Sequence, residues 1–364
     1  MGKILILANN DVGLYKFRKE LIEELLKDNQ VFISLPNGEY IKELVNMGCK
    51  FINTEVDRRG INPFTDLRLF AAYNRIIQKV KPNLVITYTI KPNIYGGLIS
   101  RIRNTKYAVN ITGLGTAFQK EGILKKIVLA MYKVSLKKAK VVFFENEENR
   151  NIFVKNKLVS ENKACELNGA GVNLEDYPFT PYPEESNDIR FLFIGRVMKE
   201  KGIDDFLEAA QRVKVDNENI QFNIVGPQEE EYTDKLIMLQ NKGIINYYGY
   251  QKDVRPFIEK AHCYVLPSYH EGMANTLLEC GAMGRPLIAS DIPGCREAIL
   301  NGESGYIVKA KSPEDLYLKI NQFIQLSNEE KKKMAQCSRT HIQQKFDKSL
   351  VVKETIEMLY TDAI

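Results

Sequence analysis

The chain has 364 residues, a net charge of +5 and a hydrophobic fraction of 44%, which together describe a globular protein too long for one ordinary domain. No apolar run approaches the roughly 18 residues that a membrane-spanning helix needs, and the short apolar start runs into polar residues too early for a signal peptide. Six scattered cysteines and only three histidines argue against a disulfide framework or a zinc site. A cytoplasmic protein is therefore expected.

Short β-rich apolar runs alternate with amphipathic stretches along the whole chain. In the first half the predicted strands are residues 4–7, 31–35, 84–88, 107–111 and 141–144, with helices such as 17–27 and 67–80 between them. In the second half they are residues 191–194, 221–225, 245–248, 263–266 and 287–289. This alternation predicts parallel, doubly wound sheets, so the expected fold class is α/β with two Rossmann-like domains.

A proline-rich, polar segment at residues 177–188 separates the two series and is typical of a linker. We expect an N-terminal domain over residues 1–180 and a C-terminal domain over residues 181–345. Ligands bind open α/β sheets at the carboxyl ends of the strands. The cleft between two such sheets is therefore the expected site.

Positive charge is concentrated in the first half. Residues 1–180 contain 28 Lys and Arg against 18 Asp and Glu, whereas residues 181–364 contain 23 against 28. A basic half suggests an anionic partner, for which nucleic acid, anionic lipid and a phosphorylated acceptor are the candidates. The chain lacks a basic motif interleaved with aromatic residues, so no nucleic acid is expected as a partner.

A first chemical cluster follows the predicted strand 191–194. Gly195 allows a ligand close to the backbone, and Arg196 and Lys201 place a guanidinium and an ammonium at the carboxyl end of the strand. Such a pair of cations suits a diphosphate. The plain alternative is a βα loop whose charges are merely solvated.

A second cluster runs from His270 to Glu279. Its helix is expected to start near Ala274 or Asn275, so that the amides of Met273, Ala274 and Asn275 face the cleft, where a helix N-terminus favours phosphate. Glu271 and Glu279 could flank a diphosphate, one near a sugar and the other near a ribose. The alternative is a capping loop followed by a surface glutamate.

A third candidate is the turn at residues 9–14, which contains Gly13 between the first strand and the first helix. A turn of this kind can contact phosphate, but it lacks the full GxGxxG pattern of a dinucleotide-binding loop. An NAD-dependent enzyme would need that fingerprint.

The order and spacing of these motifs resemble glycosyltransferase family 4. The pattern is G-R-x4-K-G from Gly195 to Gly202, E-G-x5-L-E from Glu271 to Glu279, and then residues 284–294 and 301–306, so it covers nearly all of the second half. The first half is similar to a subgroup that builds bacterial capsule, O-antigen and related lipid-linked glycans. The residues that carry this likeness are 59–63, 89–93 and 110–115.

The resemblance implies a GT-B fold, in which two domains face each other across a cleft, and transfer with retention of anomeric configuration. Arg196, Lys201 and Glu271 would be the catalytic residues: the two cations would bind the donor diphosphate, and Glu271 would contact the hydroxyls of the donor sugar. Residues 346–364 would form a helix that crosses back onto the N-terminal domain. The expected donor-binding residues are Gly13, Gly195, Gly226, Tyr250, Gly272, Met273, Ala274, Asn275, Leu277 and Glu279, with Glu279 on the ribose and Gly226 and Tyr250 at the nucleobase.

The chain departs from the family at one point. Several family members carry a first-domain histidine near the donor sugar, but no histidine precedes His262 here, and residues 112–115 occupy the place. A DxD motif is also absent, which is consistent with cations rather than a metal ion neutralising the leaving group. We therefore expect no metal and no cofactor, with a UDP-sugar as the donor substrate.

The expected function is retaining transfer of a hexose or N-acetylhexosamine from a UDP-sugar to a glycan acceptor in cell-surface glycan assembly, and the expected acceptor is linked to undecaprenyl diphosphate. A GT-B sugar-nucleotide 2-epimerase is one alternative, and it would need acid and base groups beside the sugar. A non-catalytic sugar-nucleotide-binding protein is another, and it would be expected to have lost Arg196, Lys201 or Glu271.

Residues 120–140 hold seven lysines and one acidic residue. As one helix they would place Lys126, Lys133, Lys137 and Lys140 on one stripe and the apolar residues Ile123, Ile127, Met131 and Val134 on another. This predicts peripheral docking on the anionic inner leaflet of the plasma membrane, to which each basic residue contributes about 1 kcal/mol. The alternative is a core-packed helix with solvated lysines. Arg58, Arg59, Asn62 and Lys91 are further candidates for contact with the acceptor or the membrane.

Overall fold

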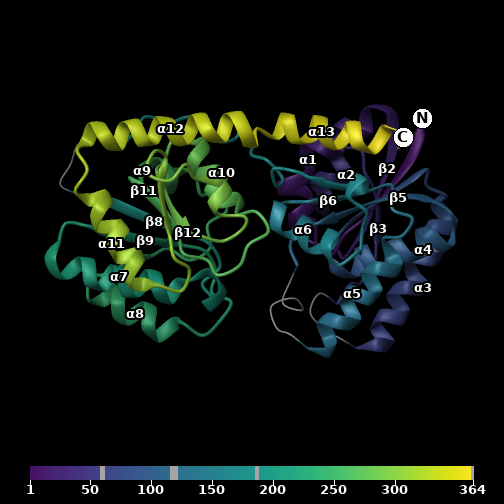
Figure 1. The fold of residues 1–364 in the computed structure, drawn as a ribbon, viewed down its shortest axis with the longest axis horizontal. Helices are drawn as coiled ribbons and strands as arrows, with labels where there is room; N and C mark the ends of the chain where they lie inside the picture. Colours follow the sequence, from purple (N-terminus) through teal and green to yellow (C-terminus); the bar gives the residue numbers. More distant parts are fainter. Residues whose placement is uncertain (58–61, 115–121, 185–187, 362–364) are drawn as a thin grey trace. The chain divides into compact units, whose positions relative to one another are not determined.

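The computed structural model describes residues 1–57, 62–114, 122–184 and 188–361. The chain divides into two compact units (Figure 1). Unit 1 comprises Met1–Ala170 and Lys348–Ile364, and unit 2 comprises Gly171–Asp347. Among the helices of the described ranges, none is long and apolar enough to cross a bilayer.

Unit 1 is built on a parallel seven-stranded sheet with the order β3-β2-β1-β4-β5-β6-β7. The strands are β1 (Gly2–Leu7), β2 (Asn29–Leu35), β3 (Lys50–Asn53), β4 (Leu84–Tyr88), β5 (Lys106–Ile111), β6 (Val141–Phe144) and β7 (Ala164–Glu166). Side chains alternate between the two faces of each strand. Ile4 and Ile6 enter one core, whereas Leu5 and Leu7 enter the other, so the sheet is buried on both sides.

Helices cover both faces of this sheet. They are α1 (Asp11–Asp28), α2 (Ile41–Asn46), α3 (Pro63–Val80), the π-helix η1 (Pro92–Gly96), α4 (Gly97–Ile102), α5 (Ile123–Ser135), α6 (Glu147–Lys155), the short η3 (Glu161–Lys163) and α13 (Lys348–Tyr360). The last of these belongs to unit 1, because Val351 and Leu359 enter the same core as Ile4 and Ile6. An ion pair of 3.3 Å between Lys348 and Glu20 fixes its start.

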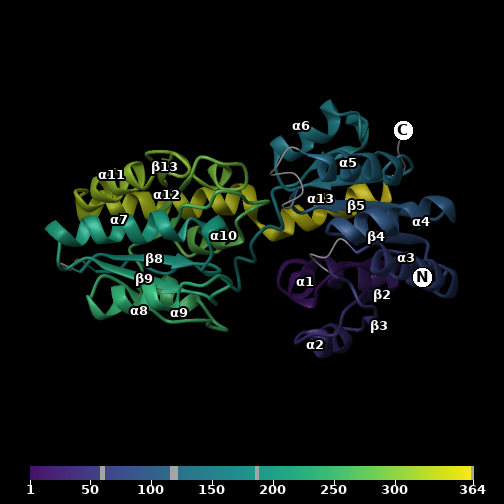
Figure 2. The same cartoon turned by 90° about the horizontal axis from the view of Figure 1, so that it is seen from below.

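Unit 2 repeats the architecture with a parallel six-stranded sheet of order β10-β9-β8-β11-β12-β13. Its strands are β8 (Arg190–Ile194), β9 (Gln221–Val225), β10 (Asn246–Tyr247), β11 (Cys263–Leu266), β12 (Leu287–Ser290) and β13 (Gly305–Val308). Its helices are η4 (Lys199–Lys201), α7 (Ile203–Asp216), α8 (Thr233–Asn241), α9 (Arg255–Lys260), α10 (Asn275–Ala282), η5 (Arg296–Ala298), α11 (Pro313–Ile324) and α12 (Asn328–Phe346). Figure 2 shows α8 and α9 on one side of this sheet and α7, α11 and α12 on the other.

The division between the units falls at Ala170 and Gly171, whereas the sequence placed it at residues 180 and 181. The proline-rich segment is part of unit 2 because its side chains and backbone bond there. The Thr180 amide donates to Met283 O at 3.3 Å, and the Tyr182 hydroxyl donates to His262 O at 3.1 Å. The fully buried Arg285 guanidinium donates to Thr180 Oγ1 at 2.7 Å.

Both sheets therefore have the strand order of a Rossmann fold, and the expected α/β class with two such domains is confirmed. The order reverses between β1 and β4 in unit 1 and between β8 and β11 in unit 2. In open α/β sheets such switch points, at the carboxyl ends of the strands, hold the ligands. In unit 2 a ligand is therefore expected at the loops that follow β8 and β11.

Candidate active site

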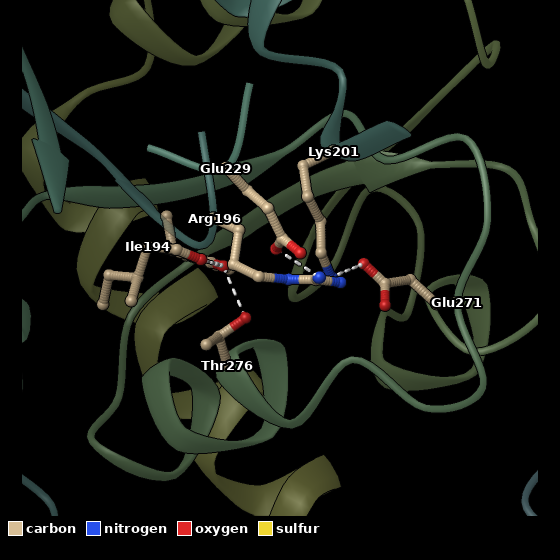
Figure 3. A network of polar contacts seen from close by, with 7 residues as sticks. Ile194, Arg196, Lys201, Glu229, Glu271 and Thr276 are labelled. Atoms are coloured by element: carbon tan, nitrogen blue, oxygen red, sulfur yellow. Dashed lines mark hydrogen bonds and ion pairs between the residues drawn. The ribbon is translucent and has the colours of Figure 1, made fainter. Parts of the chain in front are cut away.

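The switch point of unit 2 holds a cation–carboxylate pair. Lys201 follows β8 and Glu271 follows β11, and the two strands are neighbours in the sheet. Lys201 Nζ lies 2.6 Å from Glu271 Oε1, and the two side chains are only 20% and 10% exposed. Figure 3 shows Lys201 pointing toward Glu271. Two residues expected in one site are thus in direct contact.

Backbone geometry holds the two loops together. Lys201 ends the short helix η4, and Gly202 follows with a left-handed φ of 68°. A Cβ at Gly202 would lie 1.9 Å from Pro267 O, in the loop after β11, so only glycine fits there. The Tyr269 amide also donates to Glu200 O at 2.9 Å. The position of Lys201 is therefore set by contacts with the loop that carries Glu271.

Arg196 forms a second ion pair, with Glu229 in the loop after β9. The Arg196 and Glu229 side chains are 45% and 27% exposed, so this pair is more open to solvent than the first. The Val197 amide donates to Pro227 O at 2.8 Å, which keeps the two loops side by side. Figure 3 shows Arg196 pointing toward Glu229. Glu229 was not predicted from the sequence, in which the only signal for it is the acidic run of residues 229–231.

Two glycines let the carboxyl ends of neighbouring strands approach closely. Gly226 has a φ of 142°, and a Cβ there would lie 1.9 Å from Gly195 O. The Gly226 amide donates to Gly249 O at 2.8 Å, and the exposed Tyr250 follows directly. The structure therefore brings the expected nucleobase residues Gly226 and Tyr250 to the same sheet edge as Gly195.

Helix α10 begins beside this pair of loops, with Ala274 as its N-cap. The Ala274 amide donates to Gly294 O at 2.8 Å, so the expectation that this amide faces a phosphate is wrong. The amides of Met273 and Asn275 have no partner among the described hydrogen bonds. The Tyr264 hydroxyl lies 3.0 Å from Ile194 O and 2.6 Å from Thr276 Oγ1, which ties α10 to the end of β8.

Two further polar atoms flank Glu271. His270 Nε2 and Asn275 Oδ1 are buried and have no hydrogen-bond partner among the described residues. Buried polar atoms in folded proteins are nearly always paired. These two atoms therefore favour a polar ligand at the loop and helix start that follow β11, and neither side chain had been given a role from the sequence.

Glu279 lies one helical turn into α10 and has a partner of its own. It accepts a hydrogen bond from the Tyr177 hydroxyl, and burial together with the Glu279 charge raises the pKa of that hydroxyl. Tyr177 belongs to the proline-rich segment, so this contact could not be predicted from local sequence. Gly272 and Leu277, the other expected donor residues here, lie in the loop before α10 and in its buried face. Among the described residues, no three His, Cys, Asp or Glu side chains are grouped as metal ligands would be.

The expected residues of unit 1 lie in different places. Gly13 is in the first turn of α1, where its amide donates to Asn10 Oδ1 at 2.6 Å. Asn62 is the N-cap of α3 and accepts from the Phe64 amide at 2.9 Å. Lys91 forms an ion pair of 2.7 Å with Asp66. Arg58 and Arg59 lie outside the described residues.

The lysine-rich segment is not one continuous helix. Helix α5 ends at Ser135, because the Tyr107 hydroxyl binds the Ser135 carbonyl that a longer helix would use. Lys126 and Lys133 are on the helix, but Lys137 and Lys140 lie beyond it, so the expected stripe of four lysines is wrong. The Lys140 ammonium donates to Leu359 O of α13 at 2.7 Å. The core-facing residues of α5 are Val128 and Tyr132, whereas Ile123 and Ile127 are 78% and 50% exposed.

Comparison with known proteins agrees with this architecture. Residues 3–146 match the family model for glycosyl transferase 4-like domains, and residues 179–341 match the model for glycosyl transferases group 1. The chain is 29% identical to the N,N'-diacetylbacillosaminyl-diphospho-undecaprenol alpha-1,3-N-acetylgalactosaminyltransferase of Campylobacter jejuni, over 89% of each chain. It is 26% identical to the UDP-Gal:alpha-D-GlcNAc-diphosphoundecaprenol alpha-1,3-galactosyltransferase of Escherichia coli, over 79% of this chain and 78% of the other.

Solved structures share the fold. A glycosyltransferase from Rickettsia africae is 22% identical and superposes with a TM-score of 0.81 over 99% of both chains. An Anabaena protein crystallised with UDP and glucose is 16% identical, with a TM-score of 0.80 over 99% of both chains. Two family models and two Rossmann-type sheets thus point the same way, and the chain belongs to the GT-B glycosyltransferases, with a glycosyl transferase 4-like domain followed by a glycosyl transferases group 1 domain.

Proposed function

We propose that this glycosyltransferase moves a hexose or N-acetylhexosamine, with retention, from a UDP-sugar to an undecaprenyl-diphosphate-linked glycan in cell-surface glycan assembly. The observation that carries the donor half of the proposal is the Lys201–Glu271 pair at the switch point of unit 2. The acceptor half is supported by the names of the relatives from C. jejuni and E. coli, both of which act on undecaprenyl diphosphate-linked sugars.

The donor site has to stabilise a leaving diphosphate. As the bond between the sugar and the phosphate breaks, negative charge builds on the phosphate oxygens. Arg196, Lys201 and the amides of Met273 and Asn275 at the start of α10 are the donors placed at this sheet edge. Preorganised donors of this kind contribute about 3–4 kcal/mol each to transition-state stabilisation.

Both cations are paired with carboxylates in the structure. The diphosphate would therefore displace Glu229 from Arg196 and share Lys201 with Glu271. Glu271 contacts Lys201 through Oε1, so its other carboxylate oxygen can accept hydrogen bonds from hydroxyls of the donor sugar. Glu279 would hold the ribose. Retention follows if the acceptor hydroxyl attacks from the side of the leaving group and a phosphate oxygen takes its proton, a route that needs no carboxylate nucleophile.

The acceptor is proposed to reach the enzyme from the inner face of the plasma membrane. Helix α5 exposes Ile123 and Ile127 beside Lys126, and α3 exposes Phe64 and Leu67 in its first turns. Both helices lead into strands of the parallel sheet, so both begin at its carboxyl edge. That is the edge at which ligands bind in such sheets, and docking there would hold the enzyme as a peripheral, cytoplasmic protein close to a lipid-linked acceptor.

The test is acceptor-dependent release of UDP. The protein is incubated with UDP-glucose, UDP-galactose and their N-acetylated counterparts, with and without a short-chain polyprenyl diphosphate N-acetylglucosamine acceptor, and product configuration is read by NMR. UDP release only with acceptor, and an α-linked product, are expected. Conversion of the UDP-sugar at C2 without acceptor would identify a 2-epimerase instead, and UDP binding without any reaction would identify a non-catalytic binding protein.

A further inference from the structure

A basic pocket lies in unit 1, where α4, α5 and α6 end. The cavity measures about 790 Å³. Its lining includes five cationic residues and a single acidic one, and the cations are Arg101, Lys133, Lys137, Lys157 and Lys163. Its floor is apolar, with the buried side chains of Leu136, Leu158 and Val159.

The pocket is separate from the edge of the sheet at which sugar transfer is proposed. Helix α4 leads into β5, α5 into β6 and α6 into β7, so the C-terminal ends of these helices lie at the amino edge of the parallel sheet. Substrates of open α/β sheets bind at the opposite, carboxyl edge. The basic pocket therefore calls for a ligand other than the substrates.

Helix ends do not account for all of this positive charge. The C-terminus of a helix carries about half a negative charge, so three helices offset about one and a half positive charges. The Arg101 guanidinium offsets the negative end of α5, because it donates a hydrogen bond to Val134 O at 2.7 Å. The acid, Glu161, is paired with Arg150 at 3.4 Å. Among the described residues, none forms an ion pair with Lys133, Lys137, Lys157 or Lys163.

We propose that this basic pocket binds the phosphate of a membrane phospholipid headgroup. A basic rim over an apolar floor suits a phosphate attached to an apolar body. The pocket also continues the outward face of α5, because the exposed Val134 lines it and Ile127 and Ile123 lie about two and three turns back along the same face. A bilayer that lies along this face of α5, from the start of the helix at the carboxyl edge of the sheet to its end at the amino edge, would reach the pocket. The inference rests on the proposed membrane contact of unit 1.

Vesicle co-sedimentation tests the pocket directly. The full chain is mixed with phosphatidylcholine vesicles with and without phosphatidylglycerol, and the apparent Kd is measured. The double variant Lys157→Glu/Lys163→Glu changes two pocket residues that are not on α5. Binding to the anionic vesicles should weaken about tenfold or more. The control variant Lys42→Glu/Lys332→Glu changes the net charge equally at exposed lysines outside the pocket, and it should bind nearly as the wild type does.

The results of these binding measurements distinguish the pocket from an effect of net charge alone. Equal weakening of binding in both double variants would mean that only net charge matters, and it would overturn the proposal. The proposal would also fail if the pocket variant bound as the wild type does, or if the wild type did not bind anionic vesicles. Calorimetric titration with glycerol 3-phosphate tests whether the ligand of the pocket is instead a soluble phosphate compound. Micromolar binding that the pocket variant loses, with vesicle binding intact, would identify a free phosphate ligand and overturn the lipid.

The transfer assay in solution tests the proposed function separately from lipid binding by the pocket. With the short-chain acceptor, kcat and KM of the pocket variant should equal those of the wild type, because the pocket lies at the other edge of the sheet. A wild type that binds anionic vesicles through the pocket but releases no UDP would leave the pocket standing and remove the proposed function.

Discussion

Lys201 and Glu271, which lie in loops after two neighbouring strands, are joined by an ion pair of 2.6 Å with side chains that are 20% and 10% exposed. A pair this far from solvent behaves differently from a surface salt bridge. Removing one partner leaves the other charge poorly solvated, which costs more than the pair contributes when intact. The pair therefore links the stability of unit 2 to the chemistry proposed for it.

The first prediction separates these two roles. Lys201→Met should lower transfer roughly 100-fold or more, because it removes a cation facing developing charge, and should also destabilise the fold by about 1–3 kcal/mol, because Glu271 loses its partner. The double variant Lys201→Met/Glu271→Gln should recover most of the stability, since neither charge remains, while transfer stays low. Thermal denaturation and initial rates of UDP release measure the two effects. Recovery of transfer together with stability would show that Lys201 serves folding alone.

The second prediction concerns Glu229, which forms an ion pair with Arg196 and would compete with the donor diphosphate for it. Glu229→Gln should lower the KM for the UDP-sugar about two- to fivefold, a modest gain because the pair is half exposed and solvent-screened. Glu231→Gln removes the same charge from the same loop and should have little effect. In the Arg196→Ala background the benefit of Glu229→Gln should vanish. A raised KM in Glu229→Gln would instead mean that Glu229 holds Arg196 in its working position.

The third prediction uses two glycines with the same left-handed backbone. Gly202 and Gly243 both have a φ of 68°, but a Cβ at Gly202 would lie 1.9 Å from Pro267 O, whereas nothing lies within 4 Å at Gly243. Gly243→Ala should cost about 1 kcal/mol, the strain of a left-handed alanine. Gly202→Ala should cost clearly more and also reduce transfer, because the displaced loop carries Lys201. Chemical denaturation and rate measurements check both. Equal costs at the two positions would contradict the close contact with Pro267.

The fourth prediction is a pH dependence of stability. His262 is buried in unit 2, where its Nδ1 accepts from the Arg190 amide at 3.1 Å. Burial, aided by the charges of Arg190 and Arg285, lowers its pKa from 6.5 to about 4. The unfolded chain therefore binds a proton before the folded one does as the pH falls. The stability is fully present above pH 6.5 and is lost progressively toward pH 4.

The variant His262→Gln keeps an acceptor but does not titrate in this range. Between pH 6.5 and 4 its free energy of unfolding should fall less than that of the wild type, by up to about 3 kcal/mol. Urea denaturation at several pH values gives the comparison. Parallel curves for the two proteins would mean that other groups cause the acid sensitivity.

The sheets could be predicted from sequence wherever a strand is central. The runs at Leu84–Tyr88, Val141–Phe144 and Cys263–Leu266 coincide with strands of the structure, because strands covered on both faces are almost entirely apolar. The missed strands β3, β7 and β13 all lie at sheet edges. An edge strand has one neighbour, is short, and here carries polar residues or glycine, so its sequence does not differ from that of a loop.

The site could be predicted by residue type but not by partner. Strand ends and helix starts are local patterns, so Arg196, Lys201 and Glu271 were found from sequence. Their pairing depends on which strands are neighbours, and Glu229 and Tyr177 enter only through loops distant in sequence. The end of α5 could not be predicted for the same reason, because it is set by Tyr107 of β5, which is distant in sequence.

The last prediction concerns Thr89, at the carboxyl end of β4 and thus at the switch point of unit 1. Thr89 has a left-handed φ of 72°, which a β-branched residue rarely adopts, and the π-helix η1 follows it closely. Its hydroxyl is buried and has no hydrogen-bond partner among the described residues. Strain and an unpaired group both cost stability, and a folded protein retains such features mainly where they serve function. We expect Thr89 to contact a substrate.

Thr89→Gly removes both costs, because glycine accepts this backbone conformation and carries no hydroxyl. It should raise the midpoint of thermal unfolding by about 2–4 °C and lower kcat/KM in the transfer assay. Thr89→Ser keeps the hydroxyl without the branched Cβ, so it should retain most of the activity while gaining part of the stability. The combination of a more stable protein and slower transfer in Thr89→Gly is the signature of a residue kept for function, because a purely structural threonine would lose stability when removed. Full activity in Thr89→Gly would show instead that the hydroxyl contacts no substrate.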